Sequence, residues 1–117
     1  MGIFRDWRKA SIPFSLEIEF DNCNLSNAIF LGLNLQHVRI TNCLAKEVNF
    51  EEANLNNAKL TNTDFADARF QNTNLMKADF REAKNYQIDF RYNKIKQAKF
   101  SLPEAVALLK GLEIVLD

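Results

Sequence analysis

The sequence is poor in the residues that interrupt regular structure. Only three glycines and two prolines occur among 117 residues, so we expect neither a flexible linker nor a second folded domain. No apolar run approaches the length that a bilayer requires, and we expect no membrane span. The start of the chain also lacks the apolar stretch of a signal peptide, which favours a cytoplasmic location.

Groups that could carry catalysis are few and scattered. His37 is the single histidine, and no cysteine or carboxylate near it has metal-ligand spacing. No glycine-rich phosphate-binding loop is present. The adjacent Glu51 and Glu52 are interpreted as part of a solvated surface. We therefore expect no catalytic residue, no metal and no cofactor, and a protein that is not an enzyme.

The two cysteines are Cys23 and Cys43, which are twenty residues apart. A disulfide between them is geometrically conceivable if residues at this separation lie on neighbouring layers of the structure. In a reducing compartment, two free thiols that pack as small apolar residues are the favoured interpretation.

A five-residue repeat dominates what the chain does contain. From Phe20 to Phe100, every fifth residue is large and apolar except at Ala45 and Asn85, and the residue two places earlier is usually small. A period of five fits neither an α-helix nor a β-strand. Self-similarity at a fixed period over most of a chain indicates a solenoid.

The repeat resembles that of the pentapeptide repeat family, whose unit is A(D/N)LXX. Matching units include Ala53-Asn54-Leu55, Ala58-Lys59-Leu60, Thr63-Asp64-Phe65, Thr73-Asn74-Leu75 and Ala78-Asp79-Phe80, within seventeen consecutive units over residues 18–100. The resemblance implies an all-β solenoid, namely a right-handed quadrilateral β-helix. It would have one unit per side, four units per coil, about four coils and β-bridges between the coils.

The large residues sort at intervals of twenty, as a four-sided coil requires. One column contains Phe30, Phe50, Phe70 and Phe90, and a second contains Leu35, Leu55, Leu75 and Ile95. Coils joined by strand-like hydrogen bonds lie about 4.8 Å apart, a spacing at which aromatic rings can stack. We predict that these two columns are core stacks of a narrow interior.

Three segments are predicted. Residues 1–17 form an N-terminal capping segment, with an amphipathic membrane anchor as the less favoured alternative. Residues 18–100 form the β-helix, and residues 101–117 form a capping α-helix with an apolar tail. Within this last segment, Ser101 and Glu104 read as a capping box, and Gly111 suits the end of the helix.

Several asparagines need a separate explanation. We predict that Asn22, Asn42 and Asn62, and likewise Asn34, Asn54 and Asn74, form outward columns whose amides hydrogen-bond along the axis and adopt corner conformations. This structural interpretation is favoured over a recognition stripe. Asn85 and Asn93 occupy positions of the repeat that should be buried, which indicates a looser last coil that receives the C-terminal helix.

The family resemblance suggests one specific function. Some pentapeptide repeat proteins, including the quinolone-resistance Qnr group, imitate duplex DNA and bind DNA gyrase, which requires an acidic rod. This chain instead carries fifteen acidic and fifteen basic residues. Residues 17–52 hold six acidic and two basic side chains, whereas residues 81–99 hold six basic and two acidic ones. Gyrase binding is therefore the alternative hypothesis.

The preferred hypothesis is a non-catalytic protein–protein interaction or scaffold module of a bacterial cytoplasm, with a protein partner that the sequence does not identify. Lysines near Tyr86 and Tyr92 are interpreted as solvated, and no nucleic-acid partner is expected. The C-terminal segment contains more large apolar residues than one short helix can bury against a narrow rod. We predict a homodimer interface there, formed by Leu108, Leu109, Leu112, Ile114 and Leu116.

Overall fold

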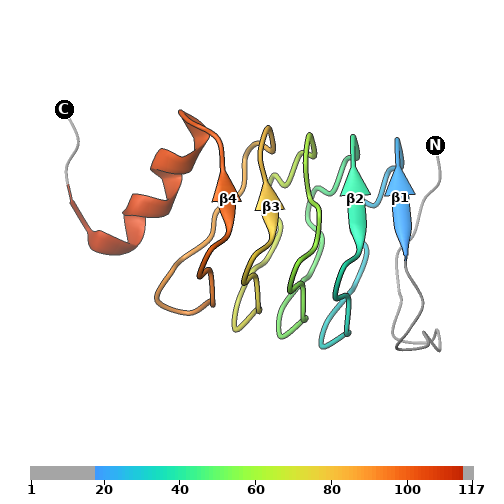
Figure 1. Ribbon diagram of the computed structural model, residues 1–117, viewed down its shortest axis with the longest axis horizontal. Helices are drawn as coiled ribbons and strands as arrows, with labels where there is room; N and C mark the ends of the chain where they lie inside the picture. Colours follow the sequence, from blue (N-terminus) through green and yellow to red (C-terminus); the bar gives the residue numbers. More distant parts are fainter. Residues whose placement is uncertain (1–17, 115–117) are drawn as a thin grey trace.

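The computed structural model describes residues 18–114, apart from the side chain of Lys110. The predicted capping segment 1–17 and Leu116 lie outside the described residues. Short strands stack along the long axis of the molecule, and a helix follows at the C-terminal end (Figure 1). The elements are β1 (Glu19–Asp21), β2 (Arg39–Thr41), β3 (Asp79–Phe80), β4 (Lys99–Phe100) and the 3-10 helix η1 (Glu104–Leu112).

The strands pair in parallel with a constant offset of twenty residues. Phe20 pairs with Ile40 between β1 and β2, and Phe80 pairs with Phe100 between β3 and β4. Isolated parallel bridges have the same offset and form four rows, such as the row that runs through Asn34, Asn54, Asn74 and Lys94. One coil therefore takes twenty residues and has four bridge positions. The strands are short because the chain turns after each bridge.

A left-handed backbone conformation produces these turns. Two residues after each central position from 20 to 80, φ lies between 52° and 69°, and the same conformation recurs at Gln97 with φ of 61°. Asparagine tolerates this region better than most residues do. Asn22, Asn42 and Asn62 adopt it, as the sequence predicts for corner residues.

The axial amide ladder predicted for Asn34, Asn54 and Asn74 is wrong. Each side-chain Oδ1 accepts a hydrogen bond from the backbone N–H two residues later in its own coil, at 3.3, 3.0 and 3.1 Å respectively. This local bond closes an Asx turn at the corner, which keeps the bond within a single coil.

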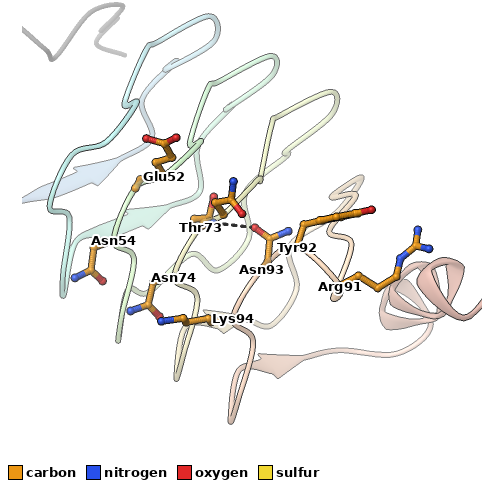
Figure 2. A pocket seen from close by; sticks show the side chains of 10 residues that line it. Glu52, Asn54, Thr73, Asn74, Arg91, Tyr92, Asn93 and Lys94 are labelled. Carbon is orange, nitrogen blue, oxygen red and sulfur yellow. Dashed lines mark hydrogen bonds between the residues drawn. The ribbon is translucent and has the colours of Figure 1, made fainter.

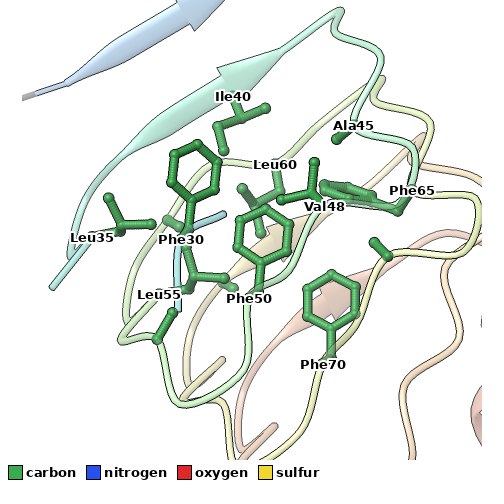
Figure 3. Packing of buried hydrophobic residues seen from close by; sticks show 14 of the residues in the cluster. Phe30, Leu35, Ile40, Ala45, Val48, Phe50, Leu55, Leu60, Phe65 and Phe70 are labelled. Carbon is green, nitrogen blue, oxygen red and sulfur yellow. The ribbon is translucent and has the colours of Figure 1, made fainter. Parts of the chain in front are cut away.

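The interior of the coils is filled by side chains. Phe50 is fully buried, and its ring stacks on Phe30 at 5.5 Å and on Phe70 at 5.2 Å between centroids. The second predicted column is buried at Leu35, Leu55 and Leu75 and partly buried at Ile95. Figure 3 shows large residues from several sides meeting in one narrow core. Burying each phenylalanine or leucine contributes roughly 1.5–3 kcal/mol.

The last coil departs from the repeat. Asn85 stands where the repeat would bury a side chain, and it is exposed with φ of 62°, while its Nδ2 donates to Asp64 Oδ1 at 3.0 Å. Tyr86 turns inward instead, 2% exposed, with its ring 5.6 Å from that of Phe80. A shift of one residue thus replaces a buried amide, which would need hydrogen-bond partners, with an aromatic ring.

Phe90 does not continue the phenylalanine stack as predicted. It is partly buried, and among the described residues no ring contact joins it to Phe70. The bridge that would pair Arg69 with Asp89 is also absent from the described coils. The chain between the bridges at Lys84 and Lys94 therefore bulges outward, which moves Phe90 toward η1.

Polar side chains connect the coils where Asn93 interrupts the apolar pattern. Thr73 Oγ1 donates to the Phe50 carbonyl at 2.8 Å. Asn93 repeats this contact one coil later, because its Nδ2 donates to the Phe70 carbonyl at 3.0 Å and its Oδ1 accepts from the Thr73 N–H at 3.0 Å. The amide of Asn93 is therefore fully engaged.

The C-terminal helix differs from the predicted capping α-helix. η1 is a 3-10 helix, and the Ser101 hydroxyl is bound to Glu82, accepting from its N–H at 3.1 Å and donating to its Oε1 at 3.3 Å. Ser101 thus joins the preceding coil and does not form the predicted capping box. The left-handed residue at the helix end is Glu113, whereas Gly111 lies inside the helix.

Gly111 is needed for the close approach of η1 to the last coil. A Cβ at this position would lie 2.5 Å from Cε1 of Phe90, which is closer than real Cβ atoms come. We expect Gly111→Ala to displace η1 and to lower the free energy of unfolding by about 1–3 kcal/mol. Relative to wild type, hydrogen exchange in the variant should accelerate in η1 and stay nearly unchanged in β1 and β2. An unchanged exchange rate in η1 would contradict the packing described.

Tyr86 should make stability depend on alkaline pH. Its hydroxyl is buried without a hydrogen-bond partner in the described part of the chain, and burial, with the charge of Glu104, raises its pKa to about 12. Between pH 10 and 12 the unfolded chain loses this proton before the folded chain does, so stability falls. We expect Tyr86→Phe to remove this part of the loss, and to stabilise the protein by about 1 kcal/mol at neutral pH.

Chemical denaturation from pH 8 to 11.5 measures both effects. Tyr92→Phe is the matched control because Tyr92 is half exposed. Equal pH profiles for wild type and Tyr86→Phe would contradict the assignment.

Candidate functional site

The side chains that could bind a metal or take part in catalysis lie apart in the fold. Among residues 18–114, no group of three histidine, cysteine or carboxylate side chains is placed to hold a metal ion. No helix in this part of the chain is long and apolar enough to cross a bilayer. His37 is exposed, and Glu51 and Glu52 lie at a corner of the coil. Glu51 makes an ion pair with Arg69 at 3.9 Å.

The cysteines are free thiols on adjacent coils. Cys43 is buried, its Sγ donates to the Phe20 carbonyl at 3.4 Å, and it accepts from the Cys23 N–H at 3.4 Å. Burial raises the pKa of the Cys43 thiol, so it stays protonated and is a poor nucleophile. The thiol thus joins neighbouring coils as the Thr73 hydroxyl does.

A groove lies where the bulged last coil meets the regular coils. It has a volume of about 440 Å³ and is lined by Glu52, Ala53, Asn54, Asn72, Thr73, Asn74, Arg91, Tyr92, Asn93 and Lys94. Figure 2 shows Glu52 at one end of the groove and Arg91 at the other, with Tyr92 and Asn93 between them. The lining is polar and open, and its hydrogen-bonding groups come from three successive coils.

The charge of Arg91 is already neutralised within the protein. Its guanidinium donates to both carboxylate oxygens of Asp89, at 3.0 and 2.8 Å, and lies 3.6 Å from Glu113. The hydrogen bonds from Arg91 lower the pKa of Asp89 and raise that of the guanidinium. Arg91 also lies over the Tyr92 ring, 5.6 Å from its centroid. These contacts of Arg91 hold the bulged segment in place and cover one face of the Tyr92 ring.

One side of the coils, which we call the amide face, has a distinct composition. It consists of residues 34–37, 54–57, 74–77 and 94–97, along the bridge row that contains Asn34, Asn54 and Asn74. Its outward side chains are amides, lysines, His37 and Met76, and none is a carboxylate. The groove opens onto this face at Asn54, Asn74 and Lys94. The sequence predicts the outward column of Asn34, Asn54 and Asn74, but the lack of carboxylates around it was not recognised because charge was compared along the axis and not around it.

The predicted dimer residues are divided by the structure. Leu108 packs against the core cluster, and Leu109 is partly buried. Leu112 and Ile114 are 52% and 50% exposed. Val106, which the sequence analysis did not include, is 44% exposed. The apolar surface of the C-terminal end therefore comes mainly from residues outside the packed side of η1.

Comparison with known proteins identifies the repeat. The family model described as pentapeptide repeats matches residues 18–44 and 46–83 in eight copies, which is more than half of the chain. No curated protein sequence matches this chain significantly.

Several solved structures are similar. Full-length QnrB1, a plasmid-mediated fluoroquinolone resistance protein, shares 20% identity over 96% of this chain, with a TM-score of 0.46. This chain spans 57% of the length of QnrB1. Rfr23 of the cyanobacterium Cyanothece 51142 shares 19% identity over 86% of this chain and 80% of its own, with a TM-score of 0.38. HetL of Nostoc sp. strain PCC 7120 is a protein involved in heterocyst differentiation regulation. It shares 15% identity over 69% of this chain and 52% of its own, with a TM-score of 0.28.

Proposed function

Because the chain belongs to the pentapeptide repeat family, whose members form right-handed β-helices, we propose that it is a non-catalytic module that binds another protein. The observation that carries this proposal is the filled interior. Central residues such as Phe50, Leu55 and Leu60 are fully buried, which leaves the outer faces for contact with other molecules. Extended faces of stacked repeats are the surfaces that solenoid proteins use for binding.

The finer architecture belongs to the same proposal. The four rows of bridges and the offset of twenty residues support a quadrilateral β-helix of about four coils. The contacts of Leu108 with the core and of Gly111 with Phe90 support η1 as the cap of its C-terminal edge. A cap at this end would prevent the addition of further strands.

Site-specific photo-crosslinking in host cells tests the proposed function. A benzophenone amino acid is placed at one exposed residue on each of the four faces, namely Arg39, Gln71, Lys84 or Gln97. A binding module should give a discrete protein adduct from one face, and excess unlabelled protein should abolish it. The absence of a competed adduct from all four positions would refute the proposal.

Binding to DNA gyrase as a DNA mimic is less well supported by this chain. The acidic residues gather toward the first coils and the basic ones toward the last, whereas duplex DNA is negative along its whole length. A gyrase supercoiling assay, with and without quinolone, separates the two functions. We expect neither inhibition nor protection at micromolar protein, and either effect would favour the DNA mimic.

We also propose a homodimer that forms through the exposed part of the C-terminal end. Val106, Leu112 and Ile114 place three large apolar side chains in solvent over a short segment, and burial against a second copy would remove them from water. Sedimentation analysis should then show a dimer for wild type and a monomer for Leu112→Lys. A monomeric wild type at high concentration would refute this interface.

A further inference from the structure

We propose that the amide face is the docking face for a short acidic peptide segment of a partner protein. This inference rests on the proposed binding function and adds the surface and the chemistry of the partner. It depends on the distribution of charge around the coils, on the lysines of this face and on the orientation of its amides.

The four faces of the described coils differ in their carboxylates. The face that contains Lys84 also contains Asp64 and Asp67, and the other two faces contain Glu51 and Asp79, each with further acidic residues. The amide face has none, although the chain has fifteen acidic residues. A negatively charged segment meets no like charge along this face.

The positive charges of the amide face are available for binding. Lys77, Lys94 and Lys96 are exposed, and none of them makes an ion pair with another described residue. The arginines of the neighbouring faces behave differently, because Arg69 and Arg81 pair with Glu51 and Asp79. The lysines therefore offer free ammonium groups, whereas the arginines are bound to nearby carboxylates.

Three amides of this face, one on each of three successive coils, are oriented as donors. The Oδ1 atoms of Asn34, Asn54 and Asn74 accept backbone N–H groups in the Asx turns, which leaves their Nδ2 groups to donate outward. Figure 2 shows Asn54, Asn74 and Lys94 on successive coils, directed to the same side. These three outward donors favour ligands that carry acceptors, such as carboxylates and peptide carbonyls.

The groove beside the amide face provides a place for an uncharged side chain. The Tyr92 ring is half exposed, and Arg91 holds it in place from one side. A peptide whose carboxylates lie along Lys94 and Lys96 can place a neighbouring apolar or aromatic residue against Tyr92. The groove thus favours a segment that mixes acidic residues with at least one large residue.

The charge of the whole chain favours an acidic peptide over a nucleic acid. A nucleic-acid strand is negative at every nucleotide and gains affinity from an extended positive field. Here the first coils are acidic, and Glu52 lies at the end of the groove nearest to them. A short segment can stay within the basic coils, whereas a longer polyanion would extend over the first coils, whose neighbouring faces are acidic.

Two double variants test the proposal in the full chain. Lys94→Gln/Lys96→Gln removes two charges from the amide face, and Lys84→Gln/Lys99→Gln removes two charges from other faces of the same coils. The probe is a fluorescein-labelled peptide of six glutamates and one tryptophan, and its binding is followed by anisotropy at two salt concentrations. The matched peptide with glutamines and a twelve-residue oligothymidylate are the comparison ligands.

We expect saturable binding of the acidic peptide that weakens about fivefold in Lys94→Gln/Lys96→Gln and less than twofold in the control variant. In NMR spectra, the side-chain amide signals of Asn54 and Asn74 should shift on binding. Equal weakening in both variants, absence of binding at millimolar peptide, or tighter binding of the oligothymidylate would each overturn the proposal. A crosslinked partner at Gln71 or Lys84 but not at Gln97 of the amide face would overturn it while the proposed function stands.

Discussion

Replacing Phe50 with alanine should lower the free energy of unfolding by about 3–5 kcal/mol, the largest effect that we expect from a single substitution. Phe50 is fully buried and lies between Phe30 and Phe70 in the stack, and its ring also meets Phe65 at 6.1 Å. The hydrogen-bonded coils above and below hold the backbone in place, so the cavity cannot collapse easily. Chemical denaturation followed by circular dichroism measures the change.

Tyr92→Ala is the control for the loss of an aromatic ring, because Tyr92 lies on the surface, half exposed. Its effect should stay within about 0.5 kcal/mol. A loss below about 1 kcal/mol for Phe50→Ala would mean that the stacked rings do not form the core of the protein.

Ala58→Leu should destabilise the protein by about 1–3 kcal/mol or more, because the interior has no room for a second large residue on one side of a coil. Ala58 is 1% exposed and lies two positions before the fully buried Leu60. Lys59→Leu introduces a leucine at the next residue, which bridges to the neighbouring coils and whose side chain lies on the outer side of its coil. That control should change stability by no more than about 0.5 kcal/mol.

Thermal denaturation of both leucine variants distinguishes a filled interior from a loose one. If Ala58→Leu were as stable as wild type, the interior would hold unfilled space beside Leu60. A matched loss in Lys59→Leu would instead indicate a general effect of added apolar surface.

The regular coils follow from the sequence because one rule governs every unit. An apolar residue at the centre of each unit, large everywhere in the regular coils except at Ala45, is sufficient to define the repeat. The order of Phe30, Phe50 and Phe70 in one column follows from the same rule, since each coil takes twenty residues. At corners such as Glu47 and Lys77, the packing of the coils holds a left-handed conformation that the residue itself does not favour.

The sequence predicts an irregular last coil from Asn85 and Asn93, but the form that the irregularity takes could not be predicted, because local preferences compete there. The spacing places Asn85 at the centre of a unit, but burial of its amide is unfavourable, so the chain shifts and buries Tyr86. That shift forms the bulge, moves Phe90 toward Gly111 and forms the groove beside Tyr92. These consequences depend on contacts between neighbouring coils, which the local pattern does not contain.

The type and the capping of the C-terminal helix were mispredicted for a similar reason. The pattern from Ser101 to Glu104 is typical of a helix start, but the Ser101 hydroxyl binds Glu82, nineteen residues earlier. The column of Asn34, Asn54 and Asn74 was predicted from the sequence, whereas the lysines that extend this face at Lys77, Lys94 and Lys96 were grouped with it only in the structure.

The constant offset of twenty residues constrains how such a protein can change in length. Inserting one full coil would lengthen the rod and leave every face continuous. Inserting a single unit of five residues between Asn74 and Lys94 would keep each large residue in the core. It would, however, move every later residue to the next side of the coil, a quarter turn away from its present face. Lys94 and Lys96 would then no longer follow Asn54 and Asn74 along one face, and a bound segment would meet only half of its contacts.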